Sequence, residues 1–405
     1  MKRNSMNAKQ ALVIAGGQWQ VPLIEELKSK NYLVTVVDPF DDSKGVLISD
    51  FHIKSDVRDK EFILSQIKND YDIVATDQSD VAVETVAYLA DKMSLVGNDI
   101  DVVRKFSNKF LSRQYAQSIG VPVPCFCEVD TVEKIQQFID CNSRNYILKP
   151  SDAQSSKGIH IITPKSSIED ISSYLADALQ YSYTKKAILE QFVTGYEITV
   201  EGFCSNGKHQ VLAISRKEHF KTGVASRLMY PGNIPCDIKD KIIDVDNLYV
   251  ELSGLKFGPT HAEYIINEET GEFWLVEIAC RGGGTLISSD IVKWVSGFDM
   301  QKAYIGSLEG ETIDVKSIIP QQNAAELHFF EFGSGVVLDI NGVDIVERIP
   351  EVLMLDLPIK IGDTIKSCVD DRSRQGFVIV QSNTEEEVSS LIKNIEQTIN
   401  IVLKK

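Results

Sequence analysis

Residues 261–284 read HAEYIINEETGEFWLVEIACRGGG, two apolar runs separated by a polar turn. The turn at 267–271 predicts a hairpin, because Asn, charged residues and Gly interrupt two runs of strand-forming side chains. In such a hairpin Glu263 and Glu277 lie on adjacent strands, so both carboxylates can point at one cation. Mg²⁺ binds proteins through one or two carboxylates together with phosphate oxygens. The pair is therefore typical of a magnesium site that also holds a phosphorylated ligand.

A second feature lies upstream, where an apolar strand ends at Lys149 and small residues follow over 151–158. Backbone N–H groups in such a segment can close over phosphate oxygens. This indicates a loop that covers a nucleotide rather than a P-loop. Some forty residues later Glu190 and Gln191 belong to another apolar strand. Lys149, the loop, the strand with Glu190 and the hairpin with its two carboxylates follow one another in an order that coincidence does not readily produce.

The N-terminal region predicts a β-α-β unit. An apolar run at 11–15 ends in Gly16-Gly17, helical spacing covers 21–28, and a β-branched run ends at Asp38. This is a Rossmann-like start, but its turn lacks the third glycine of the dinucleotide fingerprint. The hypothesis of an NAD-dependent dehydrogenase therefore rests on this unit alone, and it leaves the motif residues between 149 and 281 unexplained. The turn and the following helix N-terminus can instead hold a carboxylate or phosphate.

Length and composition exclude several classes of protein. At about 150 residues per domain, 405 residues predict two or three domains. The 25% of charged residues is average for a soluble globular protein. A net charge of −16 without a stripe of Lys or Arg argues against nucleic-acid binding. No window of 18 apolar residues predicts a membrane span, and seven cysteines, an odd number, favour a reducing, cytoplasmic location.

Taken together, these motifs resemble the ATP-grasp superfamily of carboxylate–amine ligases. Nearly the whole chain takes part in the resemblance. Its parts are Asn108-Lys109 opening a helix, Lys149 before the small-residue loop, the hinge strand at 189–193, the segment 195–197, Glu263, and Glu277 with Arg281. Within the superfamily, the segments GPTHAE at 258–263 and EIACRGGG at 277–284 look most like those of bacterial L-amino-acid ligases.

The resemblance implies an α/β and α+β multidomain fold. A Rossmann-like domain over 1–104 precedes a central ATP-grasp domain over 105–315, whose lid subdomain covers about 120–192. A small α+β domain over 316–405 completes the chain. Strands and helices alternate after residue 107 without the rhythm of a parallel sheet, as the central domain requires.

The resemblance also implies an ATP site. Lys109 and Lys149 would contact the phosphates or the adenine edge. Glu190 would bind the adenine amino group, and the backbone of Gln191 and Val193 would contact the ring. Glu197 would bind the ribose, and Ser155, Ser156 and Gly158 would lie over the triphosphate. Glu263 and Glu277 would hold Mg²⁺, with Mn²⁺ as an alternative. Arg281 would be catalytic and stabilise the charge of the transferred phosphate and of the acyl phosphate.

A further group of residues is assigned to the organic substrates. Arg216, Lys217 and Arg227 belong to a polar stretch that is either a loop closing over an anionic substrate or a solvated connection. His261 either orients a substrate carboxylate or packs on the hairpin. Gly283 and Thr285 follow the second carboxylate and are expected at the substrate pocket.

The function implied is a ligase that uses ATP and Mg²⁺ to join a small-molecule carboxylate to an amine, with an amino acid as the expected amine and a homodimer as the expected assembly. One position departs from the superfamily pattern. Ala279 stands where many members have a metal-binding Asn, which leaves the number of metal ions open. The alternatives are a purine-pathway carboxylase or transformylase of the same plan, and an ATP-binding protein without catalysis.

Overall fold

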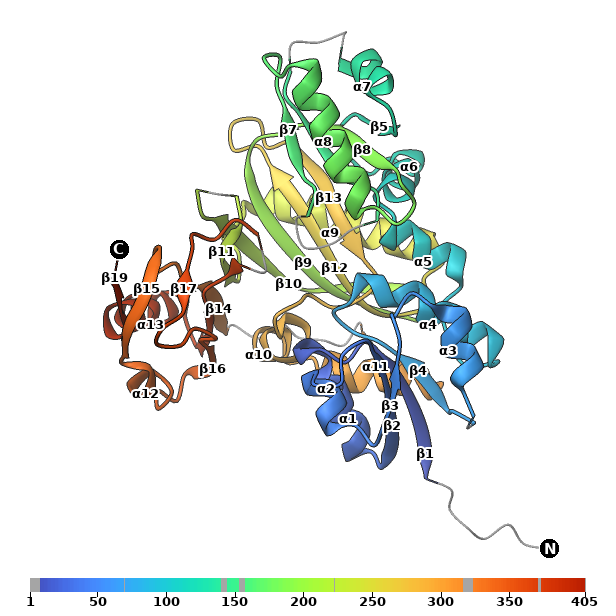
Figure 1. Ribbon diagram of the computed structural model, residues 1–405. Helices are drawn as coiled ribbons and strands as arrows, with labels where there is room; N and C mark the ends of the chain where they lie inside the picture. Colours follow the sequence, from blue (N-terminus) through green and yellow to red (C-terminus); the bar gives the residue numbers. More distant parts are fainter. Residues whose placement is uncertain are drawn as a thin grey trace, which may run out of the picture.

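The computed structural model describes residues 8–68, 70–139, 144–152, 157–221, 223–315, 323–370 and 373–404. Figure 1 shows three bodies around the yellow-green strands of a central sheet: the blue N-terminal domain, the cyan and green lid and the red C-terminal region. The fold is a mixed α/β and α+β multidomain arrangement, as the sequence predicts.

The N-terminal domain is built on a four-stranded parallel sheet in the order β3-β2-β1-β4. Helix α1 begins with Pro in its first turn and buries Leu23, Ile24 and Leu27, the spacing that the sequence predicts for one helix face. The elements are β1 Lys9–Ile14, the 3₁₀ turn Gln18–Gln20, α1 Val21–Ser29, β2 Tyr32–Asp38, α2 Lys44–Ile48, β3 Phe51–Lys54, α3 Lys60–Gln66, β4 Ile73–Ala75 and α4 Asp80–Lys92.

Two helices connect this domain to the rest, α5 Ile100–Ser107 and α6 Lys109–Ser118. The expected boundary after residue 104 falls inside α5. Asn108 caps α6, because its side chain accepts a hydrogen bond from the Leu111 amide at 3.0 Å. The cap places Lys109 in the first turn of α6, where its own amide donates to the carbonyl of Ser151 at 2.8 Å.

The lid is an antiparallel four-stranded sheet in the order β5-β8-β6-β7, with two helices. Its helices supply Ile135, Ile171 and Leu175 to a small core of their own. The elements are β5 Phe126–Val129, α7 Val132–Ile139, β6 Tyr146–Pro150, β7 His160–Ile162, α8 Ile168–Tyr181 and β8 Ala187–Gln191.

The central sheet has eight strands in the order β13-β12-β9-β10-β11-β14-β18-β16. Strand β11 pairs with β14, so strands on both sides of the expected boundary at 315 belong to one sheet. The elements are β9 Tyr196–Ser205, β10 Lys208–His219, β11 Ala225–Tyr230, α9 Cys236–Ser253, β12 Phe257–Ile266, β13 Phe273–Ala279, the π-helical turn Ile287–Ile291, α10 Val292–Ser296, α11 Met300–Leu308, β14 Ala324–Phe329, β16 Val352–Asp356 and β18 Phe377–Ser382.

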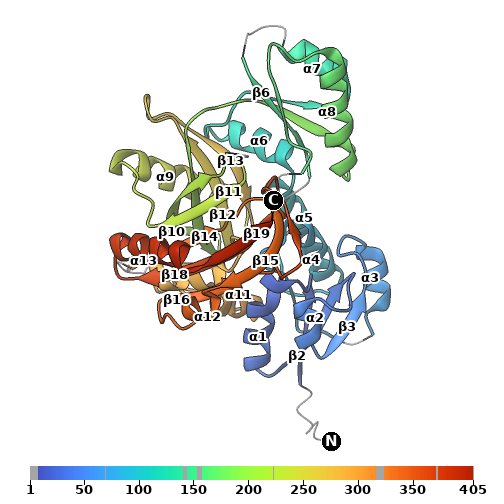
Figure 2. The same ribbon diagram turned by 60° about the vertical axis from the view of Figure 1, so that its left-hand side comes forward.

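A three-stranded sheet in the order β17-β15-β19 completes the C-terminal region beside helix α13, as the turned view shows (Figure 2). Its elements are β15 Gly335–Asn341, α12 Val343–Val346, β17 Thr364–Ile365, α13 Glu385–Thr398 and β19 Asn400–Lys404. Within the described ranges, none of the helices combines the length and the apolar character that crossing a membrane requires.

The polar stretch around Arg216 and Arg227 is a β-hairpin, so both interpretations of it as a loop or connection are wrong. Strands β10 and β11 pair Arg216 with Met229 and Glu218 with Arg227, with only residues 220–224 between the strands. The polar side chains that suggested a loop belong instead to a strand whose end lines a cleft. A strand whose end is exposed to solvent has polar side chains there, although its backbone is hydrogen-bonded to neighbouring strands.

Candidate functional site

A cavity of about 1360 Å³ lies between the lid, the central sheet and the N-terminal domain. It exceeds the roughly 300–1,000 Å³ typical of a site for one small ligand, so it has room for a nucleotide and a second molecule. The residues predicted for the site that line it are Lys109, Lys149, Glu190, Gln191, Val193, Glu197, Arg216, Lys217, His261, Glu263, Glu277, Arg281 and Thr285.

The two predicted carboxylates face each other across the hairpin of β12 and β13. Glu263 and Glu277 are direct partners in the register, which confirms the predicted hairpin. Each also accepts a hydrogen bond from an ammonium group: Glu263 from Lys217 Nζ at 2.8 Å and Glu277 from Lys109 Nζ at 2.9 Å. Burial by itself raises the pKa of the Glu263 carboxyl, but Lys217 and His261 hold it well below its ordinary range.

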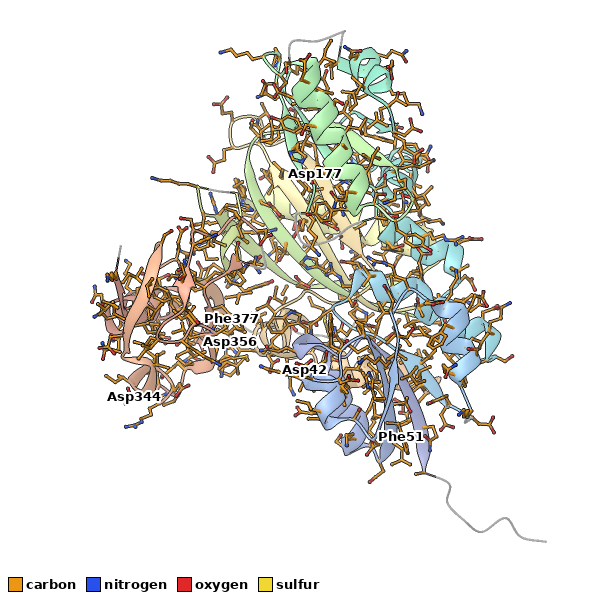
Figure 3. The ribbon with its side chains drawn as sticks, in the orientation of Figure 1. Asp42, Phe51, Asp177, Asp344, Asp356 and Phe377 are labelled. Atoms are coloured by element: carbon orange, nitrogen blue, oxygen red, sulfur yellow. The ribbon has the colours of Figure 1, made fainter. Side chains whose placement is uncertain are left out.

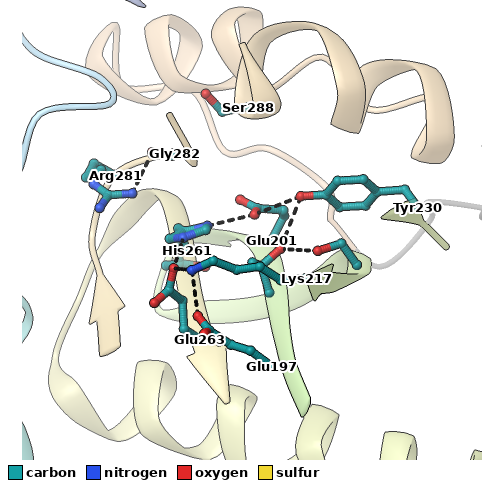
Figure 4. Close-up of polar contacts among 12 residues, drawn as sticks. Glu197, Glu201, Lys217, Tyr230, His261, Glu263, Arg281, Gly282 and Ser288 are labelled. Atoms are coloured by element: carbon teal, nitrogen blue, oxygen red, sulfur yellow. Dashed lines mark hydrogen bonds and ion pairs between the residues drawn. The ribbon is translucent and has the colours of Figure 1, made fainter. Parts of the chain in front are cut away.

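Lys217 links two acidic residues that the sequence assigns to different ligands. Its ammonium donates to Glu197 Oε1 at 2.6 Å and to Glu263 Oε1 at 2.8 Å (Figure 4). Burial lowers the pKa of Lys217, but the two carboxylates raise it above its ordinary value. His219 Nε2 lies 3.0 Å from Glu197 Oε2. The predicted ribose contact Glu197 is thus part of an ion network with a predicted substrate residue.

His261 is held from behind by a buried carboxylate. Its Nδ1 lies 2.7 Å from Glu201 Oε1, which also accepts a hydrogen bond from the Tyr230 hydroxyl at 3.3 Å (Figure 4). Burial lowers the pKa of His261, but Glu201 and Glu263 raise it to about 9. Glu201 is completely buried, and no motif in the sequence pointed to it. The imidazole is therefore packed against the sheet and lines the cleft at the same time.

Glu190 forms the centre of a buried ion triad. Arg113 Nε lies 2.5 Å from Glu190 Oε1, and Lys149 Nζ lies 2.8 Å from Oε2. The side chains of Arg113 and Glu190 are almost fully buried. Burial by itself raises the pKa of the Glu190 carboxyl, but Arg113 and Lys149 lower it to about 2. Both oxygens of Glu190 are thus engaged by cations, and its contact with an adenine amino group stays a prediction.

Removing the charge of Glu190 is expected to destabilise the fold. Glu190→Gln leaves two buried cations without a counter-ion, so the free energy of unfolding should fall by about 3–5 kcal/mol. Because the folded-state pKa is depressed, the stabilisation is present above the ordinary pKa of 4.5 and is lost as the pH falls towards 2. Urea denaturation between pH 2 and 7 checks both statements. The partly exposed pair of Glu128 and Lys186 provides a control, since Glu128→Gln should change stability by less than about 1 kcal/mol.

Arg281 is oriented by the N-terminal domain. Its Nε and Nη2 donate to the two carboxylate oxygens of Asp80, both at 2.8 Å, and its Nη1 donates to the carbonyl of Gly282. Asp80 is the first residue of α4, a position without a motif, so the sequence did not reveal it. The bidentate pair fixes the plane of the guanidinium and leaves Arg281 as part of the cleft wall.

The first two glycines after Arg281 are required by close packing. A Cβ on Gly282 would lie 2.3 Å from Ser288 Oγ, and one on Gly283 would lie 2.9 Å from Ile287. Asp77 of the N-terminal domain holds the same loop, since it accepts hydrogen bonds from the Gly282 amide at 2.8 Å and from the Ser288 hydroxyl at 2.9 Å. The loop that carries Thr285 is therefore set by contacts between two domains.

Three of the described residues predicted for the site, Gly158, Arg227 and Gly283, do not line the cleft. Gly158 packs between β6 and α8, where a Cβ would lie 2.9 Å from Tyr181. Arg227 Nη2 lies 3.2 Å from the buried Glu326, and neither Arg227 nor Gly283 is among the cleft residues. Ser155 and Ser156 lie outside the described residues. The amide of Gly16, considered for a carboxylate or phosphate, donates to Asp38 at 2.9 Å.

The donor set fits a magnesium ion that shares its ligands with phosphate. Among the residues that the structure describes, no group of three or more His, Cys, Asp or Glu side chains forms a self-sufficient metal site. Glu263 and Glu277 offer two hard carboxylates on facing strands, and Mg²⁺ ordinarily uses one or two carboxylates and takes its other ligands from phosphates and water.

Family models match two parts of the chain. An ATP-grasp domain matches residues 142–290, and an L-amino acid ligase C-terminal domain 2 matches residues 328–404. Among curated proteins, a D-alanine–D-alanine ligase of Coprothermobacter proteolyticus is 25% identical over 47% of this chain and 64% of its own length. An alanine–anticapsin ligase of Bacillus subtilis is 25% identical over 58% of this chain and 53% of its own length. The chain thus spans less than two thirds of these two relatives.

Solved structures resemble the chain over nearly its whole length. An L-amino acid ligase from Bacillus licheniformis has a TM-score of 0.82 and 19% identity, covering 99% of this chain and 100% of that one. A phosphoribosylglycinamide synthetase from Anaerococcus prevotii has a TM-score of 0.74 and 18% identity, covering 98% and 100%. At these identities the likeness establishes the fold. Together with the two family models, it shows an ATP-grasp fold, in which residues 142–290 match the ATP-grasp domain and residues 328–404 match the L-amino acid ligase C-terminal domain 2.

Proposed function

We propose that the protein uses ATP and Mg²⁺ to convert a small-molecule carboxylate into an acyl phosphate, which an amine then attacks to form an amide. One observation carries this proposal: a single cleft brings together Lys109, Lys149 and Arg281 with the facing carboxylates Glu263 and Glu277. Cations and metal-binding carboxylates at one end of a large cavity are what phosphoryl transfer requires, because catalysis there consists mostly of positioning and charge neutralisation.

The two steps need no nucleophilic side chain from the protein. A substrate carboxylate oxygen attacks the γ-phosphorus, the bond to the β-phosphate oxygen breaks, and ADP leaves. The amine nitrogen then attacks the acyl carbon, the C–O bond to phosphate breaks, and inorganic phosphate and a proton are released. A bound Mg²⁺ would neutralise phosphate charge. Arg281, oriented by Asp80, stabilises the negative charge that develops during both transfers.

An amino acid is the proposed amine. The names of the alanine–anticapsin and D-alanine–D-alanine ligases, both similar to this chain, give alanine as a molecule that is joined. The cleft also suits a zwitterion, because its lining carries both charge signs, the cations Lys217 and Arg281 and the carboxylates Glu197 and Glu263.

The proposal is tested by phosphate release from Mg-ATP across a matrix of carboxylates and amino acids, with mass spectrometry of the products. We expect turnover only when both organic substrates are present, with ADP, phosphate and a product heavier than either substrate. Release only with bicarbonate or formate and a ribotide would support the purine-pathway alternative. Binding of ATP without turnover across the matrix would support a non-catalytic nucleotide-binding protein.

A further inference from the structure

The two carboxylates proposed for Mg²⁺ each have a cation supplied by the chain itself. Glu263 and Glu277 are direct partners in the register of β12 and β13, and like charges directly opposite on neighbouring strands destabilise a sheet. Glu263 Oε1 accepts a hydrogen bond from Lys217 Nζ at 2.8 Å, and Glu277 Oε1 accepts one from Lys109 Nζ at 2.9 Å. Two ammonium groups therefore offset the repulsion between the two carboxylates.

Lys217 reaches Glu263 across a whole strand. It lies on β10 opposite Glu197 of β9, whereas Glu263 lies on β12, on the other side of β9. Neighbouring strands are about 4.8 Å apart, so the backbones of β10 and β12 are separated by roughly 10 Å, which the long stem of lysine helps to span. Figure 3, in which Asp177 marks the lid and Asp42 marks the N-terminal domain, shows the central strands between these two bodies. The contact therefore crosses the part of the sheet that lines the cleft.

The other charged groups around Glu263 are paired as well. The Lys217 ammonium also donates to Glu197 Oε1 at 2.6 Å, and the side chain of Lys217 is only 15% exposed. His261, which Glu201 holds from behind, places its Nε2 3.7 Å from the same oxygen of Glu263 that Lys217 contacts. A cation that approaches Glu263 therefore meets a carboxylate that an ammonium group and an imidazole already engage.

This arrangement treats a bare metal ion and a metal–nucleotide complex differently. A bare Mg²⁺ ion brings two positive charges towards the ammonium of Lys217, and repulsion between charges is strong where little water screens them. A complex of Mg²⁺ with a nucleotide carries the negative charges of its phosphates, which lysines attract. The lysines therefore oppose binding of the bare ion and favour binding of the complex.

We propose that Lys217 is the resident counter-ion of the metal site: it neutralises Glu263 and keeps bare divalent cations from binding until they arrive with a nucleotide. Lys109 plays the same part at Glu277. The inference rests on the metal site of the proposed function, and it assigns Lys217 to that site rather than to an organic substrate. Lys217 is a positioning residue and not a metal ligand, because an ammonium group has no lone pair to donate.

The test measures the affinity of the nucleotide-free protein for Mn²⁺ by electron paramagnetic resonance of the free ion. We expect Lys217→Met to bind Mn²⁺ at least about 10-fold more tightly than the unmodified protein, because the charge is removed and the length of the side chain is kept. Lys217→Arg keeps the charge, so its affinity should stay within about twofold. Lys208→Met is the matched control, since Lys208 lies on the same strand, is mostly exposed and pairs with Glu251 at 3.4 Å outside the cleft lining.

A nucleotide and heat separate this role from a structural one. ADP should tighten Mn²⁺ binding by a larger factor in the unmodified protein than in Lys217→Met, because only the unmodified protein has the repulsion that the phosphates offset. Mn²⁺ should also raise the unfolding temperature of Lys217→Met more than that of the unmodified protein. A lysine that only supports the fold would instead give a loss of stability that Mn²⁺ does not reverse.

Two further variants locate the effect. Glu263→Gln in the Lys217→Met background should abolish the gain in Mn²⁺ affinity, because the carboxylate that Lys217 neutralised is gone. A gain that persists in the double variant would place the tighter site elsewhere and overturn the inference. Lys109→Met tests the same expectation independently at Glu277, so the proposal stays testable if Lys217→Met does not fold.

Turnover of the unmodified protein is measured separately, with the matrix of carboxylates and amino acids. Turnover together with a Mn²⁺ affinity that Lys217→Met leaves unchanged or weakens would overturn the counter-ion and leave the ligase function standing. Tighter binding of Mn²⁺ by Lys217→Met, without turnover by any pair of substrates, would support the counter-ion and overturn the ligase function. Unchanged affinity without turnover would overturn both.

Discussion

Glu277→Gln is expected to lower kcat by on the order of 10³-fold, because the substitution removes one of the two carboxylates proposed to hold Mg²⁺. A bound metal ion contributes several kcal/mol of charge stabilisation to such a transition state, and each 1.4 kcal/mol corresponds to a tenfold change in rate. Gln preserves the size of the side chain and can still accept a hydrogen bond from Lys109, so the hairpin should remain folded. Steady-state kinetics at several Mg²⁺ concentrations measure the effect.

Glu268→Gln is the matched control for this prediction. Glu268 lies in the turn between the two strands of the same hairpin, where its side chain is mostly exposed and pairs with Arg216 at 3.1 Å. We expect its kcat to stay within about twofold of the unmodified protein, as for a surface ion pair. The assignment of Glu277 would be wrong if Glu277→Gln kept its rate and its dependence on Mg²⁺ while the control did the same.

Arg281→Lys is expected to lower kcat by about 10²–10³-fold, the effect of removing one preorganised donor to a developing negative charge. Lysine keeps the positive charge, but it cannot form the two parallel hydrogen bonds with Asp80 that set the plane of the guanidinium. The KM for ATP should change little, since Arg281 acts on the transferred group. Arg348→Lys serves as the control, because that side chain is exposed and pairs loosely with Asp344.

A double-substitution cycle identifies the part that Asp80 plays as a positioning residue. Asp80→Asn alone should lower kcat, because it weakens the bidentate contact, but in the Arg281→Lys background it should add little further loss. Fully additive losses would mean that Asp80 acts on the reaction independently of Arg281. Unchanged thermal unfolding of both variants would show that the effects are on the site rather than on the fold.

Local patterns in the sequence were sufficient for much of the fold. Helical spacing over 21–28 predicted α1, which spans Val21–Ser29, and the polar turn at 267–271 predicted the pairing of Glu263 with Glu277. Both features depend on residues close together in the chain. The prediction for the stretch from Arg216 to Arg227 was wrong because it also used local information alone. The polar side chains indicated a loop, whereas pairing with β9 and within the β10–β11 hairpin makes the stretch part of a sheet.

The sequence by itself determined many of the elements, the order of the charged motifs and the resemblance to a family, because each of these is carried by neighbouring residues or by motifs of fixed spacing. Only the tertiary structure decided which partners these residues have. Asp80 holds Arg281 from a distance of 201 positions in the chain, and Trp19 meets Phe377 across more than 350. Such contacts arise from how domains pack, and the periodicity of helices and strands carries no information about that packing.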